Sequence, residues 1–247
     1  MKSSLINPVG TTPMVVTEMV KFFLTEYKKP ITDVVIITTN NKNVLSGAYM
    51  AGSALKVNYP KIRVHYEFLT SSDVRDFNDI INLVDKIGEI VKNERNNHNV
   101  DNVYLNVSGG RKVESIILSN FSQLLKIDEV WAVVNLNFEN YNIEYERYKD
   151  ELVNFRDGEN IDYYMKNADK FNPIFFPDSG LSFFEIPSIK LSREDLNLLK
   201  ILLKGIDLED SNIPEYKIDA FISSNLLAYN KKRSVPTELG EVILKYL

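Results

Sequence analysis

Residues 103–125 read VYLNVSGGRKVESIILSNFSQLL, an apolar stretch, a glycine-basic turn and a second apolar stretch in direct succession. The run at 103–107 predicts a buried strand, and the spacing of apolar residues over 113–125 predicts a helix. Residues 108–112 (SGGRK) join the two. A strand that passes into a helix in this way is typical of α/β proteins with a parallel sheet.

Strand and helix patterns alternate on both sides of this stretch throughout residues 1–136. The further predicted strands are 5–6, 34–39, 63–69 and 129–134, and the further predicted helices are 14–27, 44–58 and 76–95. Residues 34–39 (VVIITT) are all β-branched, as expected of a strand that is covered on both faces. The alternation predicts an α/β, Rossmann-like fold with a mostly parallel, doubly wound sheet.

The chain changes character after residue 136. Residues 137–188 are rich in Tyr, Phe, Asn and acidic side chains, contain three prolines and show little periodicity. We expect a connector with short strands there, forming a hairpin over the sheet. Residues 189–247 form a third region, which we expect to be a small domain.

Helix signals organise this third region. Ser192 and Asp195 have the spacing of a capping box, and Gly205 ends the helix that they begin. A second helix is predicted over 214–228, followed by a basic turn and a final helix capped by Thr237. This order is similar to the back half of a winged helix, so we expect a winged-helix-like domain.

Composition excludes several classes of function. There are 29 Lys and Arg against 34 Asp and Glu, a net charge of −5 that argues against a broad surface for coating nucleic acid. Cysteine is absent, which excludes thiolate metal sites. His65 and His98 are the only histidines, which argues against a histidine-rich metal site or a two-histidine acid/base pair. We expect no metal and no cofactor. No segment reads as a membrane span or a secretory leader, and we expect a cytoplasmic protein.

Three polar loops follow predicted strands, where ligands bind to an open parallel sheet. The candidate ligand-binding residues are Gly10, Thr11, Thr12, Thr39, Asn40, Asn41, Ser108, Gly109, Gly110, Arg111 and Lys112. Their hydroxyls, amides and backbone N–H groups, close to helix N-termini, suit an anion.

The loop at 108–112 carries the strongest signal. Its glycines allow close backbone approach, Arg111 offers a fork that suits phosphate, and Lys112 adds a compact charge. The sequence matches neither a Walker P-loop nor GxGxxG, which disfavours triphosphatase and dinucleotide-binding functions. Each loop also has a purely structural interpretation: a helix-entry turn with solvated cations, and Thr at an N-cap before Pro13.

The segments NPVGTTPMVVTEMV (7–20), TTNN (38–41) and NVSGGRK (106–112) resemble those of CRISPR-associated Rossmann-fold (CARF) domains. The resemblance covers residues 1–136. It implies a homodimer that binds a cyclic oligoadenylate. The similar ring nucleases cleave cyclic tetra-adenylate in this pocket, using a hydroxyl of the first loop and basic residues of the later loop. By position these are Thr11 or Thr12, and Arg111 with Lys112.

We therefore expect metal-independent cleavage of cyclic tetra-adenylate to linear adenylates with a 2′,3′-cyclic phosphate, with Lys112, Arg111, Thr12 and Thr11 as candidate catalytic residues. An alternative is a transcription regulator that senses the ring without cleaving it and contacts DNA through residues 231–233 (KKR). DNA binding is possible but less favoured, because the segment 206–213 leaves little room for a full helix-turn-helix. An effector ribonuclease is disfavoured because no histidine follows His98.

Overall fold

A six-stranded sheet with strand order β3-β2-β1-β4-β5-β6 organises the computed structural model. The structure describes residues 1–70, 73–136, 149–188, 190–208, 211, 213–230 and 232–247. The first five strands pair in parallel and β6 pairs antiparallel to β5. The strands are β1 (Ser3–Pro8), β2 (Asp33–Thr38), β3 (Arg63–Phe68), β4 (Asn102–Asn106), β5 (Glu129–Asn135) and β6 (Leu181–Glu185). The predicted α/β, Rossmann-like and mostly parallel sheet is confirmed.

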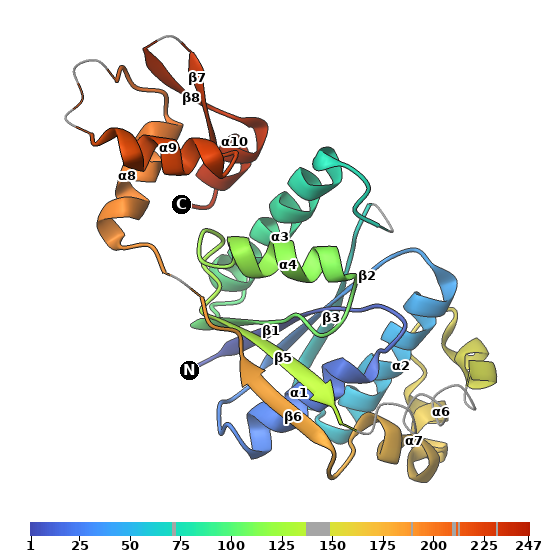
Figure 1. Cartoon of the computed structure of the whole chain (residues 1–247). Helices are drawn as coiled ribbons and strands as arrows, with labels where there is room; N and C mark the ends of the chain where they lie inside the picture. The colour runs from blue at the N-terminus through green and yellow to red at the C-terminus, as the bar shows by residue number, and fades with distance from the viewer. Residues whose placement is uncertain (71–72, 137–148, 189, 209–210, 212, 231) are drawn as a thin grey trace.

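Helices cover both faces of the sheet (Figure 1). One face carries α1 (Met14–Thr25) and α2 (Lys42–Asn58), and the other carries α3 (Phe77–Asn97) and α4 (Lys112–Phe121). Val34 and Ile36 of β2 enter the core on the α1 side, whereas Val35 and Ile37 enter the core on the α3 side. The β-branched strand is therefore buried on both faces, as its composition predicts.

The region expected to be a connector completes one face of this domain. It contains a 3-10 helix η1 (Lys149–Phe155), α6 (Ile161–Lys166) and α7 (Ala168–Phe175), followed by the edge strand β6. Phe155, Tyr164 and Phe171 are fully buried in the core on the α1 side. A hairpin over the sheet is wrong for the described residues, because aromatic side chains anchor helices there; residues 137–148 lie outside the described part.

The C-terminal region contains α8 (Arg193–Leu203), α9 (Glu215–Ser223), the antiparallel pair β7 (Leu227–Asn230) and β8 (Arg233–Pro236), and α10 (Glu238–Leu244). Ser192 and Thr237 cap α8 and α10 as predicted. The helix predicted over 214–228 is wrong at its end: Asn225 has φ 60° and Leu226 N–H bonds to Phe221, so the helix closes early and a strand follows.

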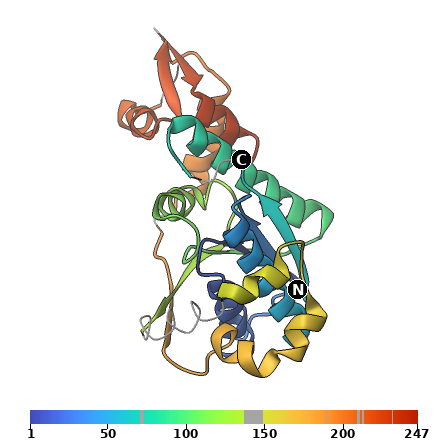
Figure 2. The same ribbon diagram turned by 90° about the vertical axis from the view of Figure 1, so that its right-hand side faces the viewer.

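This C-terminal unit lies against the α3 side of the sheet domain (Figure 2). Its leucines share the hydrophobic core with α3 and α4, and Tyr246 donates a hydrogen bond to Asp85 of α3. In the part of the chain that the structure describes, no helix combines the length and the apolar character needed to cross a bilayer.

Candidate anion site at the strand ends

Two of the predicted loops meet beyond the carboxyl ends of the neighbouring strands β1 and β4. The helix after β1 covers one face of the sheet and the helix after β4 covers the other, so the loops lie at a topological switch point. A cavity of about 330 Å³ lies there, and we call it the loop cavity. Its lining includes Gly10, Thr11, Thr39, Asn41, Gly110 and Arg111, which come from all three predicted loops.

The glycines of the third loop allow this close approach. A Cβ on Gly109 would lie 2.0 Å from the Pro8 carbonyl oxygen, and Gly110 has φ +76°, a conformation that favours glycine. Across the gap, a Cβ on Gly10 would make only ordinary contacts of 3.4 Å or more with Gly110. Glycine is therefore required at positions 109 and 110, and not at position 10.

A pair of buried asparagines ties the two strand ends together. Asn106 Nδ2 donates to Asn7 Oδ1 at 3.1 Å and to the Val15 carbonyl at 3.0 Å, and Asn106 Oδ1 accepts from Ser108 N–H at 3.0 Å. Both asparagine side chains are fully buried. Because buried amides are costly unless they are bonded, this network fixes β1, β4 and α1 in one arrangement.

The two threonines of the first loop take different positions. Helix α1 begins at Met14 with Pro13 at the N-cap position, and no side chain caps it. The interpretation of a threonine as the cap is therefore wrong, because Pro13 occupies that position. Thr11 is exposed and lines the loop cavity, whereas Thr12 is half-buried outside its lining.

The two cations of the third loop also diverge. Arg111 lines the cavity, and its guanidinium lies 3.4 Å from Asp73 Oδ2 in a largely exposed ion pair. Lys112 is the first residue of α4 and is exposed outside the cavity lining. A single protomer therefore brings one of the two predicted cations to the loop cavity.

Glu114 is a site residue that we did not single out from the sequence. Its carboxylate is buried, lines the loop cavity and accepts the Arg111 N–H at 2.8 Å. Burial raises the pKa of this carboxyl group, the Arg111 backbone hydrogen bond opposes the rise, and the Asp73 charge adds to it. Its position three residues after Arg111, the N-cap residue of α4, is that of the glutamate in a capping box.

The remaining predicted residues have mainly structural contacts. Asn41 caps α2 by accepting from Asn43 and Val44 N–H groups, and Thr39 Oγ1 accepts from Asn41 N–H at 3.4 Å. Asn40 is exposed outside the cavity lining. Ser108 Oγ accepts the Val133 N–H at 2.6 Å and so ties the loop to β5.

A second cavity, of about 180 Å³, adjoins the loop cavity along Leu69 and Glu114. Its lining carries five carboxylates, from Asp73, Asp79, Asp85, Glu89 and Glu114, with Lys86 as the one cation. Such a lining repels anions. An anionic ligand at the strand ends would therefore be confined to the side of Arg111.

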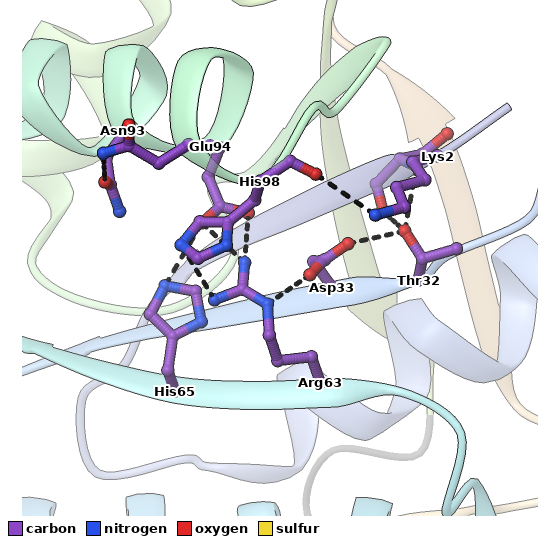
Figure 3. Close-up of polar contacts among 10 residues, drawn as sticks. Lys2, Thr32, Asp33, Arg63, His65, Asn93, Glu94 and His98 are labelled. Carbon is purple, nitrogen blue, oxygen red and sulfur yellow. Dashed lines mark hydrogen bonds and ion pairs between the residues drawn. The ribbon is translucent and has the colours of Figure 1, made fainter.

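The two histidines lie in a different polar cluster, on β3 and at the end of α3 (Figure 3). Arg63 pairs there with the fully buried Glu94 at 2.8 Å and with Asp33. His65 Nε2 lies 3.4 Å from Glu94, and burial lowers the pKa of His65. Arg63 begins β3, so this cluster lies toward the amino ends of the strands, whereas the loop cavity lies beyond their carboxyl ends. Within the described residues, no group of three or more His, Asp or Glu side chains could hold a metal ion.

A protein family and a solved structure are similar to this chain. A family model described as CRISPR-associated protein NE0113 matches residues 12–211, more than half of the chain. No curated protein sequence matches this chain. Among solved structures, Enterococcus italicus Csm6 bound to cyclic hexa-2′-fluoro-hexa-dAMP is similar, with a TM-score of 0.48 and 13% identity over 82% of this chain. The similar part spans 46% of the length of that Csm6 chain.

Proposed function

The chain belongs to the CRISPR-associated protein NE0113 family, and from that premise we propose that it is a CARF-type ring nuclease. It binds cyclic tetra-adenylate in the cytoplasm and cleaves it without a metal, leaving linear adenylates that end in a 2′,3′-cyclic phosphate. This switches off type III CRISPR signalling. The observation that carries the proposal is the meeting of the Thr11 and Arg111 loops around one cavity at the switch point of the sheet.

The residues around the cavity suit a phosphodiester. Arg111 supplies a bidentate cation, Thr11 a hydroxyl without a partner among the described residues, and the N-terminal ends of α2 and α4 add positive potential. Glu114 holds the Arg111 backbone in place. These groups can bind and orient a phosphate without a resident metal.

The proposed reaction uses the ligand's own ribose. The 2′-oxygen attacks the adjacent phosphorus, its proton passes to water, and the 5′-oxygen leaves and takes up a proton. Arg111 and Lys112 stabilise the charge on the phosphorane and the leaving oxygen, while Thr11 orients the phosphate. Positioning and preorganised charge can each contribute several kcal/mol to such a step.

A homodimer completes this site in our proposal. The loop cavity of about 330 Å³ is at the small end for a drug-sized ligand, so one protomer holds only part of a four-nucleotide ring. Lys112 lies outside it, next to exposed apolar side chains. Exposed apolar side chains of the sheet domain include Val113 and Ile116 of α4, Val134 and Leu136 at the end of β5, and Phe184 of β6. In our proposal they form one surface, which we call the apolar patch. A second copy on this patch would bring both α4 N-termini to one two-fold axis.

The alternative, a regulator that contacts DNA, has weaker support. Lys217 is the one cation of α9, and it pairs with Asp195 at 2.7 Å. Arg233 donates to the Gly205 carbonyl at 2.8 and 3.0 Å. Both groups are engaged inside the C-terminal unit, and Lys231 lies outside the described residues. We therefore propose that this winged-helix-like unit has a structural role.

The test is incubation with cyclic tetra-adenylate in EDTA, followed by analysis of the products. We expect linear products with a cyclic phosphate.

Arg111→Ala weakens binding about tenfold or more, because charged hydrogen bonds contribute about 1.5–3 kcal/mol. Lys112→Ala abolishes cleavage with binding largely kept. Arg156→Ala, at an exposed arginine of the turn after η1, is the control. Tight binding without cleavage, together with ligand-dependent DNA retention, contradicts the nuclease and favours the regulator.

A further inference from the structure

A third cavity, of about 150 Å³, lies where the C-terminal unit joins the sheet domain. Its lining comes from α3 (Lys92, Arg95), the turn after α4 (Lys126) and the residues that follow α10 (Lys245, Tyr246). We call it the lysine cavity. Arg95 contacts Asp101 and Asp128, which immediately precede β4 and β5. This cavity therefore lies at the amino ends of the strands, whereas the loop cavity lies beyond their carboxyl ends.

Arg95 positions the turn that carries Lys126. Its guanidinium donates to the Asp101 carbonyl at 3.0 Å, to the Lys126 carbonyl at 2.8 Å and to Asp128 Oδ2 at 2.7 Å. Ile127 N–H bonds back to Ser122 and closes the end of the helix, with Lys126 at φ 59°. The Lys126 backbone is therefore fixed at the rim of the cavity by bonds from two sides.

Positive charge accumulates here in a chain whose net charge is −5. Partial burial and the neighbouring cations Lys200, Arg95 and Lys92 lower the pKa of Lys126. Within the described part of the chain, neither Lys92 nor Lys126 has a carboxylate at ion-pair distance. Lys245 pairs with Asp85 at 3.0 Å and Arg95 with Asp128, which leaves the charges of Lys92 and Lys126 uncompensated. Both lysines are exposed residues of the cavity lining, and an anion bound between them would lower their mutual repulsion.

The shape and lining of the lysine cavity indicate what that anion is. About 150 Å³ is less than half of the volume of the loop cavity, which suits one compact group rather than a nucleic-acid strand. Tyr246 is the one aromatic side chain of the lining; it is buried, and its ring packs against Gly88 while its hydroxyl donates to Asp85. It therefore offers no face on which a base could stack.

We propose that the lysine cavity is a second anion site, which binds the phosphate group of a phosphomonoester or inorganic phosphate. Lys92 and Lys126 supply the uncompensated charges from the sheet domain, and Lys245, which also pairs with Asp85, lines the cavity from the C-terminal unit. A bound phosphate bridges the two parts and strengthens a joint that Asp85 makes with Lys245 and Tyr246. This site is independent of the nuclease proposed above.

The test is a calorimetric titration of the full chain with inorganic phosphate at constant ionic strength. The Arg111→Ala variant is used as the parent, so that phosphate binding in the loop cavity is removed. We expect saturable binding that Lys92→Gln and Lys126→Gln each weaken about tenfold or more. Lys61→Gln, at an exposed lysine of the α2–β3 turn, removes the same charge elsewhere and leaves the binding unchanged. AMP and adenosine separate the phosphomonoester from its nucleoside, and we expect only AMP to compete.

Three results overturn the proposal: the absence of saturable phosphate binding, an equal loss in Lys61→Gln, and tighter binding of an unphosphorylated single-stranded RNA than of phosphate through Lys126. The last result would make the cavity part of a surface for RNA. Thermal unfolding provides a second measurement, because a bound phosphate raises the Tm of the parent and not that of Lys126→Gln. Loss of ring cleavage with phosphate binding kept affects only the function proposed for the loop cavity.

Discussion

Arg111, which lines the loop cavity, pairs with Asp73, which lines the adjoining cavity, and a phosphate would compete with that carboxylate for the guanidinium. Their separation is 3.4 Å, and both side chains are substantially exposed. Exposed ion pairs are weak, so Asp73 restrains Arg111 without blocking it. A ligand must displace this contact before it can use the arginine as a fork.

Under the proposed function, we therefore expect Asp73→Asn to tighten the binding of cyclic tetra-adenylate. We expect a gain of about two- to fivefold, which is the range set by the loss of one exposed ion pair. Calorimetric titration of the ring against both proteins measures it, and the gain shrinks at high salt because surface charges are screened. Asp162→Asn, at an exposed position of α6, is the matched control. Weaker binding in Asp73→Asn would show that the carboxylate holds Arg111 in its productive position.

Glu114 makes stability depend on pH. Burial raises the pKa of its carboxyl group, so the folded state holds a proton at pH values where the unfolded chain has lost it. The contribution of this group to the free energy of unfolding is fully present below the ordinary glutamate pKa and is lost as the pH rises through the raised value. Glu114→Gln keeps an oxygen for the Arg111 N–H and buries no charge.

We therefore expect the Tm of Glu114→Gln, relative to that of the parent, to increase between pH 4.5 and pH 8. Thermal unfolding followed by circular dichroism across this range measures the difference. Glu215→Gln, at an exposed glutamate of α9, should show no such trend. A constant difference in Tm for Glu114→Gln would mean that its carboxyl group titrates alike in the folded and unfolded chains.

At the scale of elements, the close contact between the β1 and β4 loops requires a residue without a side chain at position 109. Gly109→Ala places a Cβ 2.0 Å from the Pro8 carbonyl, and neither backbone can yield easily. Overpacking of this kind costs about 1–3 kcal/mol. We expect urea unfolding to show that loss, together with weaker ring binding. Gly10→Ala, on the facing loop, meets only ordinary contacts and should change stability little; equal losses in both variants would contradict this explanation.

The repeating elements were predictable from the sequence because periodicity and β-branching report burial directly. The five parallel strands and the four helices of the first 136 residues lie within a few residues of their predicted positions. The early end of α9 was missed because Asn225 in a left-handed conformation is a local backbone choice inside a continuing helical pattern. Helices α6 and α7 were missed because their aromatic residues are buried by tertiary contacts, with too few turns to show a period.

The candidate site was predictable to a similar extent. Loops after strands could be placed at one edge of the sheet, and six of the eleven candidate residues line the loop cavity. Asp73 could not be found, because it reaches Arg111 from a loop that only the fold brings near. Asn7 and Asn106 read as ordinary polar residues in strands, and only their burial reveals the bond that joins the loops.

At the scale of the whole molecule, the proposed function needs a second copy, because Lys112 lies outside the loop cavity of its own protomer. Lys112 is exposed at the start of α4, and Ile116 of the same helix is 61% exposed. A charged side chain in the centre of an apolar interface must give up its hydration without a partner. Ile116→Lys should therefore separate the dimer, while the fold, to which this exposed side chain contributes little, keeps its Tm.

Light scattering coupled to size exclusion, at several protein concentrations, measures the mass of each variant. We expect a dimer for the parent and a monomer for Ile116→Lys, with ring cleavage lost because one protomer brings only its own Arg111 and Lys112 to the ring. Ile201→Lys makes the same exchange at an exposed isoleucine of α8 and should stay dimeric and active. If Ile116→Lys stays dimeric, α4 is not at the interface; if it is monomeric and fully active, a single loop cavity is sufficient for cleavage and Lys112 must act within its own protomer.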